Sequence, residues 1–281
     1  MIQKTFRILL APLIAVAAFC ACERQIDFDY PPADMSVVFD GQISNEGVDV
    51  RISHTRPIGT KGKGEPVGDA QVWIADDEGK EEQLVYDDSR GCFTSATGLV
   101  GIPGHTYQMR AIVDGRQFEA TSTMQGAAVV DTVYFRWIKA MSVKLYFYYV
   151  KGRDPRVNER QYALCRLMRG DELFRWTYRS GRGNVNGIFE YDIVCSTQKE
   201  MDDGIDEDGK IPLMEGDSIS LELLTFDRPA WEFYQSLSSS ERTTANPVTN
   251  IKGGAQGIFM AANITRPGTI VFNKEKAFNE R

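Results

Sequence analysis

The sequence predicts an all-β protein that contains one short helix. Short segments rich in β-branched and aromatic residues recur every eight to twelve residues, and Gly, Asp and Pro separate them. The pair Asp114-Gly115 lies between two alternating runs and is a strong hairpin signal. We therefore expect two all-β domains: an immunoglobulin- or prealbumin-like β-sandwich followed by a second β-sandwich-like domain with one short helix.

Seven short strands are expected in the first half of the chain. Turn residues separate them at Asp77-Glu78-Gly79-Lys80, at Pro103-Gly104 and at Asp114-Gly115. The expected strands are Met35–Ile43, Val48–His54, Ala70–Ala75, Glu82–Tyr86, Gly91–Ser95, Thr106–Val113 and Gln117–Thr123. Their number and spacing predict a sandwich over residues 35–126.

The second half, residues 127–281, continues with strands and contains the helix. Its expected strands are Thr132–Lys139, Val143–Val150, Gln161–Met168, Leu173–Arg179, Ile188–Val194 and Ser218–Phe226, with a return to strand in Ile251–Phe272. The segment Pro229–Ser238 has Pro in its first turn and aromatic side chains at helical spacing. We expect a helix over residues 229–238, with Asp227 as its N-cap.

The first 21 residues have the pattern of a signal peptide. Lys4 and Arg7 precede an apolar run of twelve residues, Ile8–Phe19, which is too short to cross a bilayer core of about 30 Å. Ala21-Cys22 provides the small residue that a bacterial lipobox needs before its lipidated cysteine, whereas Phe19-Cys20 does not. We expect cleavage after Ala21, lipidation of Cys22 and a linker over residues 22–34. Several acyl chains would anchor the protein firmly to a membrane.

Composition excludes several classes of function. The formal net charge of −7 and the absence of a basic excess argue against a nucleic-acid partner. The chain has two histidines and neither a Gly-x-Ser-x-Gly motif nor a phosphate-binding glycine loop. We therefore expect a protein that is not an enzyme and has no required cofactor.

Three cysteines remain in the expected mature body: Cys92, Cys165 and Cys195. Three thiols allow one disulfide at most, and Cys165 with Cys195 is the favoured pair because they lie in neighbouring strand-like segments. The alternative is that all three are free thiols buried on strands. The sequence does not decide between the two.

Several segments, taken in order, resemble one family of bacterial lipoproteins. They are Cys22–Pro31, Val37–Ile43, Pro66–Val72, Pro103–Tyr107, Thr121–Met124, Gly216–Leu223 and Asn250–Phe259. The chain is similar to Bacteroidetes lipoproteins catalogued as domain of unknown function 4249, and residues 66–124 resemble the prealbumin-like repeat of carboxypeptidase regulatory domains. The resemblance implies a β-sandwich first domain and no catalytic residues. Because members are typically encoded beside TonB-dependent outer-membrane receptors, it also implies such a receptor as partner.

An acidic segment, Lys199–Glu215, departs from the family pattern. Residues 204–215 match an EF-hand loop in part, but Gly204 stands where the first carboxylate ligand belongs and the flanking segments look like strands. Asp203, Asp206, Asp208 and Glu215 could hold Ca²⁺ in another geometry. The alternative is a solvated connecting loop.

Charge is distributed unevenly in the second half. Residues 151–182 have a net charge of +5, and residues 190–227 have a net charge of −10. The two segments either face each other within one sheet, or the arginines form a surface for an anionic ligand or the membrane. Strand pairing decides between these alternatives.

Three aromatic residues alternate with other side chains in the strand-like segment 173–179. Alternation places Phe174, Trp176 and Tyr178 on one face and Arg175 with Arg179 on the other. If the three rings are exposed, they could stack on sugar rings. If they are buried, they belong to the core of a sandwich.

Two hydroxyl residues match the Asp-Ser/Thr-apolar acceptor of bacterial O-glycosylation, namely Thr132 and Ser218. Both also suit a turn that leads into a strand, where Asp is favoured. Modification would require both hydroxyl groups to be exposed.

The sequence thus predicts a lipid-anchored outer-membrane protein that serves as an accessory or binding subunit beside a TonB-dependent receptor in nutrient uptake. A fimbria-like structural or adhesive subunit and a surface carbohydrate-binding lipoprotein are the alternatives. Periplasmic and surface-exposed locations both fit, because Arg24 follows Glu23 directly where surface-export signals place acidic residues.

Overall fold

The structure is a computed structural model that describes residues 35–56, 62, 64–157, 159–182, 187–240 and 245–279. The expected signal peptide, the lipidation site Cys22 and the linker 22–34 lie outside these residues.

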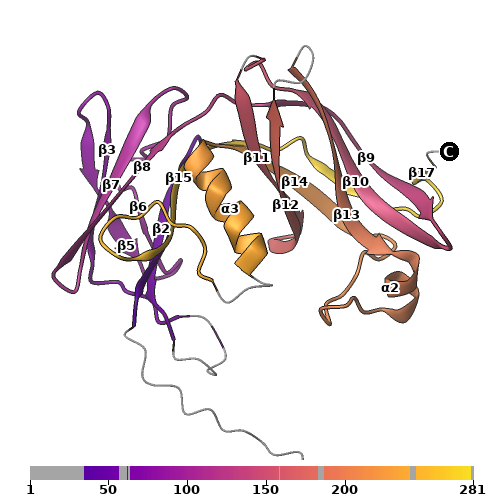
Figure 1. Ribbon diagram of the computed structural model, residues 1–281, viewed down its shortest axis with the longest axis horizontal. Coiled ribbons are helices and arrows are strands. Elements are labelled where there is room, and N and C mark those ends of the chain that lie inside the picture. Colours follow the sequence, from indigo (N-terminus) through magenta and orange to yellow (C-terminus); the bar gives the residue numbers. More distant parts are fainter. Residues whose placement is uncertain are drawn as a thin grey trace, which may run out of the picture. The chain divides into compact units, whose positions relative to one another are not determined.

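The all-β prediction is confirmed, since strands make up most of the described chain (Figure 1). The strands of the first half are β1 (Val37–Ser44), β2 (Gly47–His54), β3 (Gln71–Asp76), β4 (Glu81–Gln83), β5 (Val85–Asp87), β6 (Cys92–Thr94), β7 (Thr106–Val113) and β8 (Arg116–Thr123). Those of the second half are β9 (Val129–Ala140), β10 (Val143–Arg153), β11 (Arg160–Arg169), β12 (Glu172–Arg182), β13 (Ile188–Thr197), β14 (Ser218–Thr225), β15 (Gln256–Thr265), β16 (Thr269–Val271) and β17 (Phe278–Asn279). The helices of the described residues are α2 (Gln198–Asp203) and α3 (Arg228–Ser240).

The strands form three sheets. The largest has the order β12-β11-β14-β15-β1-β2-β6-β5, with β16 paired to β14. The other two have the orders β13-β10-β9-β17 and β4-β3-β7-β8. Strand β1 pairs with β15 in parallel and with β2 in antiparallel orientation, so the first and last thirds of the chain share one sheet.

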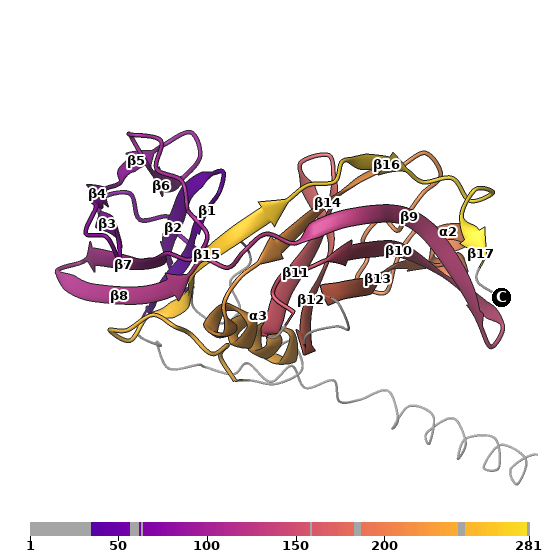
Figure 2. The same cartoon turned by 90° about the horizontal axis from the view of Figure 1, so that it is seen from above.

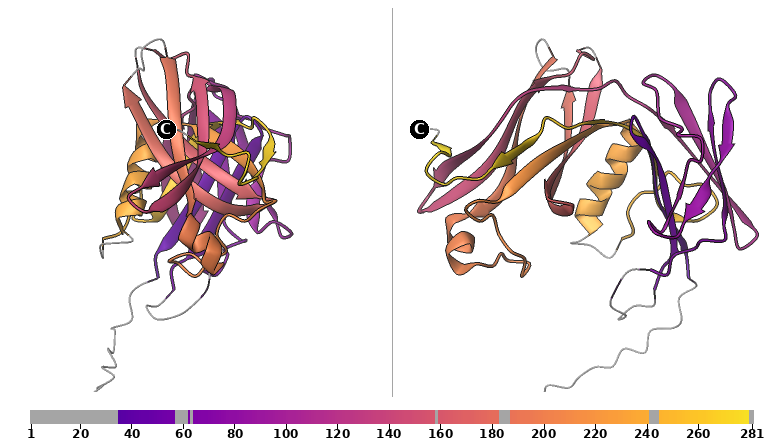
Figure 3. Two further views of the ribbon diagram at one scale, coloured as in Figure 1. Left: turned by 90° about the vertical axis from the view of Figure 1, so that its right-hand side faces the viewer. Right: turned by 180° about the vertical axis from the view of Figure 1, so that it is seen from behind.

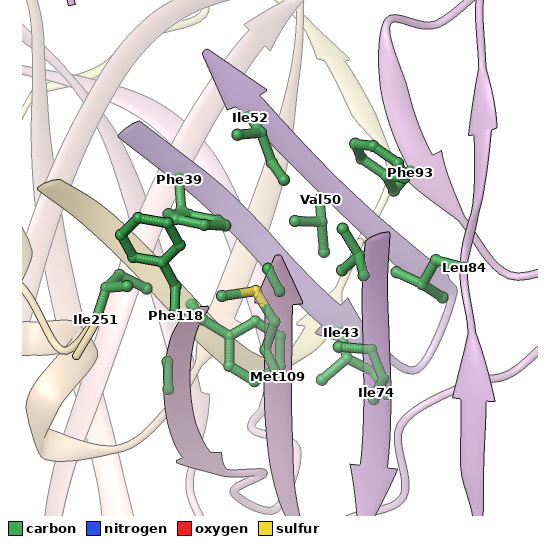
Figure 4. Close-up of a cluster of buried hydrophobic side chains, with 14 of the residues drawn as sticks. Phe39, Ile43, Val50, Ile52, Ile74, Leu84, Phe93, Met109, Phe118 and Ile251 are labelled. Carbon is green, nitrogen blue, oxygen red and sulfur yellow. The ribbon is translucent and has the colours of Figure 1, made fainter. Parts of the chain in front are cut away.

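The first hydrophobic core lies between β1, β2 and β15 of the large sheet and the β4-β3-β7-β8 sheet (Figure 4). Alternate residues of β1 and β2 point into it, among them Phe39, Ile43 and Val50. Met109 and Phe118 enter from the opposite sheet. Two sheets that face each other in this way form a β-sandwich.

The hairpin signal at Asp114-Gly115 is confirmed. Both residues have positive φ values, 51° and 74°, as a type I′ turn requires. The turn joins β7 to β8 in the register Val113↔Arg116.

Strand β15 is buried on both faces. Phe259 and Ala261 belong to the first core, whereas Ile258 and Met260 belong to a separate core beside α3. Side-chain amides complete its backbone hydrogen bonds where no strand is adjacent: Asn250 accepts from Phe259 N at 3.0 Å, and Asn45 accepts from Ile264 N at 2.7 Å. Double burial explains why this segment is a nearly continuous apolar run.

A second core lies between the β13-β10-β9 sheet and β11, β12 and β14 (Figure 3). Its large side chains are aromatic, including Phe135, Tyr148 and Phe272. The Phe135 ring lies 5.3 Å from that of Tyr148 and 5.0 Å from that of Phe272, both at nearly perpendicular angles. Edge-to-face contacts of this kind stabilise a core beyond the burial of area.

Helix α3 packs beside β11, β12 and β15 (Figure 2). It extends further at both ends than the expected 229–238. Asp227 precedes it and accepts a hydrogen bond from Ala230 N at 3.3 Å, as the N-cap prediction requires. The other carboxylate oxygen of Asp227 accepts from Ser122 Oγ and Thr123 N of β8, both at 2.9 Å. Burial raises the pKa of Asp227, and these donors oppose the rise.

Two expectations for local structure were wrong. The single strand expected over Glu82–Tyr86 is two strands in different sheets, β4 and β5, because Leu84 between them turns into the first core. The expected loop after β13 begins with α2, whose start is fixed by a capping box between Thr197 and Glu200.

No helix of the described residues is long and apolar enough to cross a membrane. The domain boundary expected near residue 126 stays a prediction. Residues from both sides of it share the large sheet through the ladder between β1 and β15.

The ladder between β1 and β15 predicts the effect of a single methyl group. Gly257 has a φ of +96°, and a Cβ there would lie 1.9 Å from the Phe39 carbonyl oxygen. We expect Gly257→Ala to lower the free energy of unfolding by more than about 4 kcal/mol, a loss that only severe strain or core disruption produces. Chemical denaturation measures it.

Gly216→Ala is the matched control. Gly216 also has a positive φ, +87°, but no atom lies within 4 Å of its Cβ position. Only backbone strain of about 1–3 kcal/mol should result. Equal losses in the free energy of unfolding of the two variants would contradict the close approach of β1 and β15.

Candidate functional site

A cavity of about 410 Å³ lies along β12, next to the end of α3 and the loop that follows α2. Its walls combine aromatic rings, carboxylates and basic groups. The lining residues are Phe174, Arg175, Trp176, Thr177, Tyr178, Glu200, Asp206, Glu207, Asp208, Lys210 and Ser238. It brings together the aromatic strand and the acidic segment that the sequence singled out separately.

The prediction that three rings share one face of β12 was wrong. Opposite β11, Arg175 pairs with Leu167 and Leu173 pairs with Met168, which leaves Phe174 as the extra residue of a β-bulge. A bulge interrupts the alternation of side chains. Phe174 is therefore buried in the second core, whereas Trp176 and Tyr178 pack on the opposite side, against the core beside α3.

Trp176 and Tyr178 are half-buried and contact α3 through their rings. The Trp176 ring lies 5.9 Å from that of Tyr234, and the Tyr178 ring lies 6.3 Å from that of Trp231. Part of each ring still lines the cavity. These two rings offer an aromatic surface to a ligand, whereas Phe174, although it lines the cavity, is buried in the second core.

Arg175 organises the polar side of the cavity. Its Nη2 donates to Asp206 Oδ2 at 2.8 Å, and its Nε donates to the Cys195 carbonyl of β13 at 3.2 Å. Its guanidinium also lies 4.5 Å from the centre of the Phe174 ring. One side chain thus links β12, β13 and the loop after α2.

Arg179 repeats this link further along the strand. It donates to the Asp192 carbonyl of β13 at 2.6 Å. Strands β12 and β13 belong to different sheets and do not pair. Arginine side chains of β12 therefore donate hydrogen bonds to backbone carbonyl groups of β13 across the gap between the sheets. We call this contact the arginine seam, formed by Arg175 and Arg179 with the carbonyls of Cys195 and Asp192.

The four predicted Ca²⁺ ligands are not gathered at one point. Asp206 is engaged by Arg175 and accepts from the backbone N–H groups of Asp208 and Lys210. Although burial raises its pKa, the Lys210 N–H and Arg175 outweigh that effect and hold the pKa of Asp206 below its ordinary value. Asp203 ends α2, Asp208 is exposed, and Glu215 accepts from Lys274 N at 2.9 Å.

Glu200 is a cavity residue that the sequence reasoning missed. Its carboxylate accepts from Thr197 N at 2.7 Å, and Thr197 Oγ1 accepts from Glu200 N at 3.1 Å. The signal was present, because Thr-x-x-Glu is the pattern of a capping box.

Ion pairs join the basic and acidic segments of the second half, so the expectation that they face each other is confirmed. Arg169 contacts Asp217 at 2.7 Å, Arg166 contacts Glu222 at 3.9 Å and Lys151 contacts Glu190 at 2.9 Å. The arginines in these ion pairs hold the basic and acidic segments together within the fold.

The three cysteines Cys92, Cys165 and Cys195 are free and buried, as the second alternative expected. Burial raises the pKa of Cys165 and of Cys195 to about 12. Both thiols therefore stay protonated at neutral pH.

Thr132 and Ser218 are exposed at the beginnings of β9 and β14. Their exposure meets the requirement for O-glycosylation, and the modification itself stays a prediction.

A family model described as "Domain of unknown function (DUF4249)" matches residues 23–267. Because the match spans most of the sequence, the protein belongs to this family.

No curated protein sequence matches the chain. Among solved structures, the chain is similar to the chicken interferon gamma receptor alpha chain, with 12% identity and a TM-score of 0.20. The similarity covers 69% of this chain and 91% of that one. At this TM-score it carries no argument about function.

The arginine seam predicts a pH-dependent contribution to stability. Arg175→Met removes the partner of the buried Asp206 carboxylate and the donor to the Cys195 carbonyl. We therefore expect the free energy of unfolding to fall by about 2–3 kcal/mol at pH 7. Because the folded pKa of Asp206 is lowered, the ion pair stabilises the fold above the unfolded pKa. The difference in the free energy of unfolding between variant and wild type should therefore narrow as the pH falls through the pKa of Asp206 in the folded protein.

Arg160→Met is the control, since Arg160 lies exposed on the neighbouring strand β11. It should change stability by less than about 0.5 kcal/mol. Denaturation curves at neutral and acidic pH measure both variants, and a difference that grows on acidification would contradict the role of Asp206.

Proposed function

We propose that the protein is a non-enzymatic lipoprotein of a Bacteroidetes outer membrane, anchored through Cys22. In this proposal it serves as an accessory or binding subunit of a TonB-dependent receptor in nutrient uptake. The observation that carries the proposal is the sequence Ala21-Cys22 after a short apolar run, in a chain that belongs to this family. The two-sheet core that residues 35–126 share with residues of 251–261 supports a prealbumin-like first domain.

The anchor would confine the body to a membrane surface. Residues 22–34 join the lipidated cysteine to the first described residue, and a chain of that length spans at most about 45 Å when fully extended. Confinement close to one surface raises the effective concentration of the protein for membrane partners. An accessory subunit needs a stable domain that can bind a partner and a tether that keeps this domain near the membrane.

The fimbria-like alternative is less well supported. Such subunits exchange a strand with a neighbour. Here β1, the first described strand, is paired on both sides, with β2 and β15, and its apolar side chains are buried in the first core. Releasing it would disrupt that core.

The anchoring proposal is tested in the native host. We expect mass spectrometry of the membrane fraction to find an acylated N-terminal Cys22, and mild-detergent purification to recover a TonB-dependent receptor. Cys22→Ser should release the protein from membranes, because the acyl chains supply its attachment.

Cys20→Ser is the matched control, since that residue would leave with the signal peptide. It should change neither acylation nor receptor recovery. A bare Cys22 thiol on a soluble protein would refute the anchor. Purification of the anchored protein without any outer-membrane receptor would refute the partner.

A second candidate function is carbohydrate binding in the cavity beside β12. Trp176 and Tyr178 line it together with Glu207, Asp208 and Lys210, and saccharides are bound by such combinations of rings and polar groups. The three-ring platform that the sequence suggested is reduced to two rings.

We expect a glycan array to identify a bound oligosaccharide, and Trp176→Ala to weaken its binding at least about tenfold, the effect of losing roughly 1.4 kcal/mol of ring contact. Trp73→Ala is the control, because Trp73 is also half-buried but stacks with Arg110 away from the cavity. Equal effects of both changes, or no bound glycan, would contradict this function.

A further inference from the structure

Two segments of the first sandwich, one at the end of β3 and one just before β7, bring together the side chains of Asp76, Glu78 and His105. Each can offer one ligand atom, and these atoms all lie within 4.8 Å of one another. Among the described residues no other three His, Cys, Asp or Glu side chains do so. The group lies where β3 ends and β7 begins, away from the cavity beside β12.

The backbone around these side chains is held firmly. Asp76 pairs with Tyr107 in the ladder between β3 and β7. Its Oδ1 accepts from the N–H groups of Glu78 and Lys80, at 3.0 and 2.9 Å. These two bonds use Oδ1, and a carboxylate has a second oxygen with which Asp76 can bind a ligand.

The imidazole of His105 is oriented by a fourth residue. Its Nδ1 lies 2.8 Å from Asp77 Oδ1, and Thr106 N donates to Asp77 Oδ2 at 3.1 Å. Asp77 therefore connects the imidazole of His105 to the backbone at the start of β7. With the proton on Nδ1, the lone pair of Nε2 is left for a ligand.

This carboxylate–imidazole pair is the arrangement found behind metal-binding histidines, where the carboxylate fixes the ring and strengthens its lone pair. One nitrogen and two carboxylate oxygens suit a borderline dication such as Zn²⁺ better than Ca²⁺, which prefers oxygen ligands alone. Lys80 lies 3.7 Å from Glu78 and is exposed, so a metal ion can displace it.

We propose that Asp76, Glu78 and His105 form a binding site for a divalent transition-metal ion, of which Zn²⁺ is the test case. Asp77 acts as the positioning residue for His105. The three protein ligands leave at least one coordination position open to water or a ligand group from another molecule. The site is independent of the proposed lipid anchor and of the cavity beside β12.

The other histidine of the chain provides an internal comparison. His54 Nε2 lies 3.0 Å from Asp114 Oδ2, so it also has a carboxylate partner. No second and third carboxylate is grouped with it among the described residues. If a surface His–Asp pair were enough to bind Zn²⁺, His54 and His105 would respond alike to added Zn²⁺.

The experiment uses the full-length protein in detergent, freed of metals by chelation and labelled selectively on histidine. Two imidazole signals are expected, because the chain has two histidines, and single His→Gln variants assign them. Zn²⁺ should shift the His105 signal in a saturable way with a stoichiometry of one. Calorimetry should show that His105→Gln abolishes this binding and that Asp77→Asn weakens it about 10- to 100-fold.

Glu78→Gln provides a variant that keeps the fold, since Glu78 is mostly exposed, and it should also weaken Zn²⁺ binding. His54→Gln should leave the binding unchanged. The buried, protonated thiols of Cys165 and Cys195 do not compete for the metal.

Three results would overturn the proposal. The first is a dissociation constant for Zn²⁺ weaker than about 1 mM, the range of non-specific contacts. The second is an equal response of His54 and His105. The third is preferential binding of Ca²⁺ without any shift of the His105 signal.

Discussion

The fold depends on one strand that is covered on both faces. β15 contributes Phe259 and Ala261 to the first core and Ile258 and Met260 to the core beside α3, and its ladder with β1 joins the beginning and the end of the described chain. A strand in this position has no polar face to present to water. Its register with β1 is correspondingly strict, because a shift by one residue would exchange the residues that belong to the two cores.

Charged side chains complete the packing where strands do not pair. In the arginine seam, guanidinium groups of β12 donate to carbonyl groups of β13, and Asp206 holds Arg175 in place. An unpaired strand edge otherwise exposes backbone groups to unwanted partners. The unequal charges of residues 151–182 and 190–227 therefore have a structural reason, and the same interactions shape one wall of the cavity beside β12.

Local features were predictable from the sequence, whereas features that depend on strand pairing were not. Alternation and turn residues located most strands, the Asp114-Gly115 hairpin and α3. The bulge at Phe174 arises from its register with β11, so alternation within β12 alone placed that ring on the wrong face. The cavity and the grouping of His105 with Asp76 depend on contacts between segments far apart in the chain.

The pairing of β1 with β15 also determines when the chain can fold. During synthesis the first strand emerges long before its partner, and the first core cannot close until residues 256–265 have been made. Contacts so distant in sequence make folding slow and leave apolar strands uncovered in the meantime. The apolar strands of a nascent chain therefore stay open to aggregation until nearly the whole chain has been synthesised.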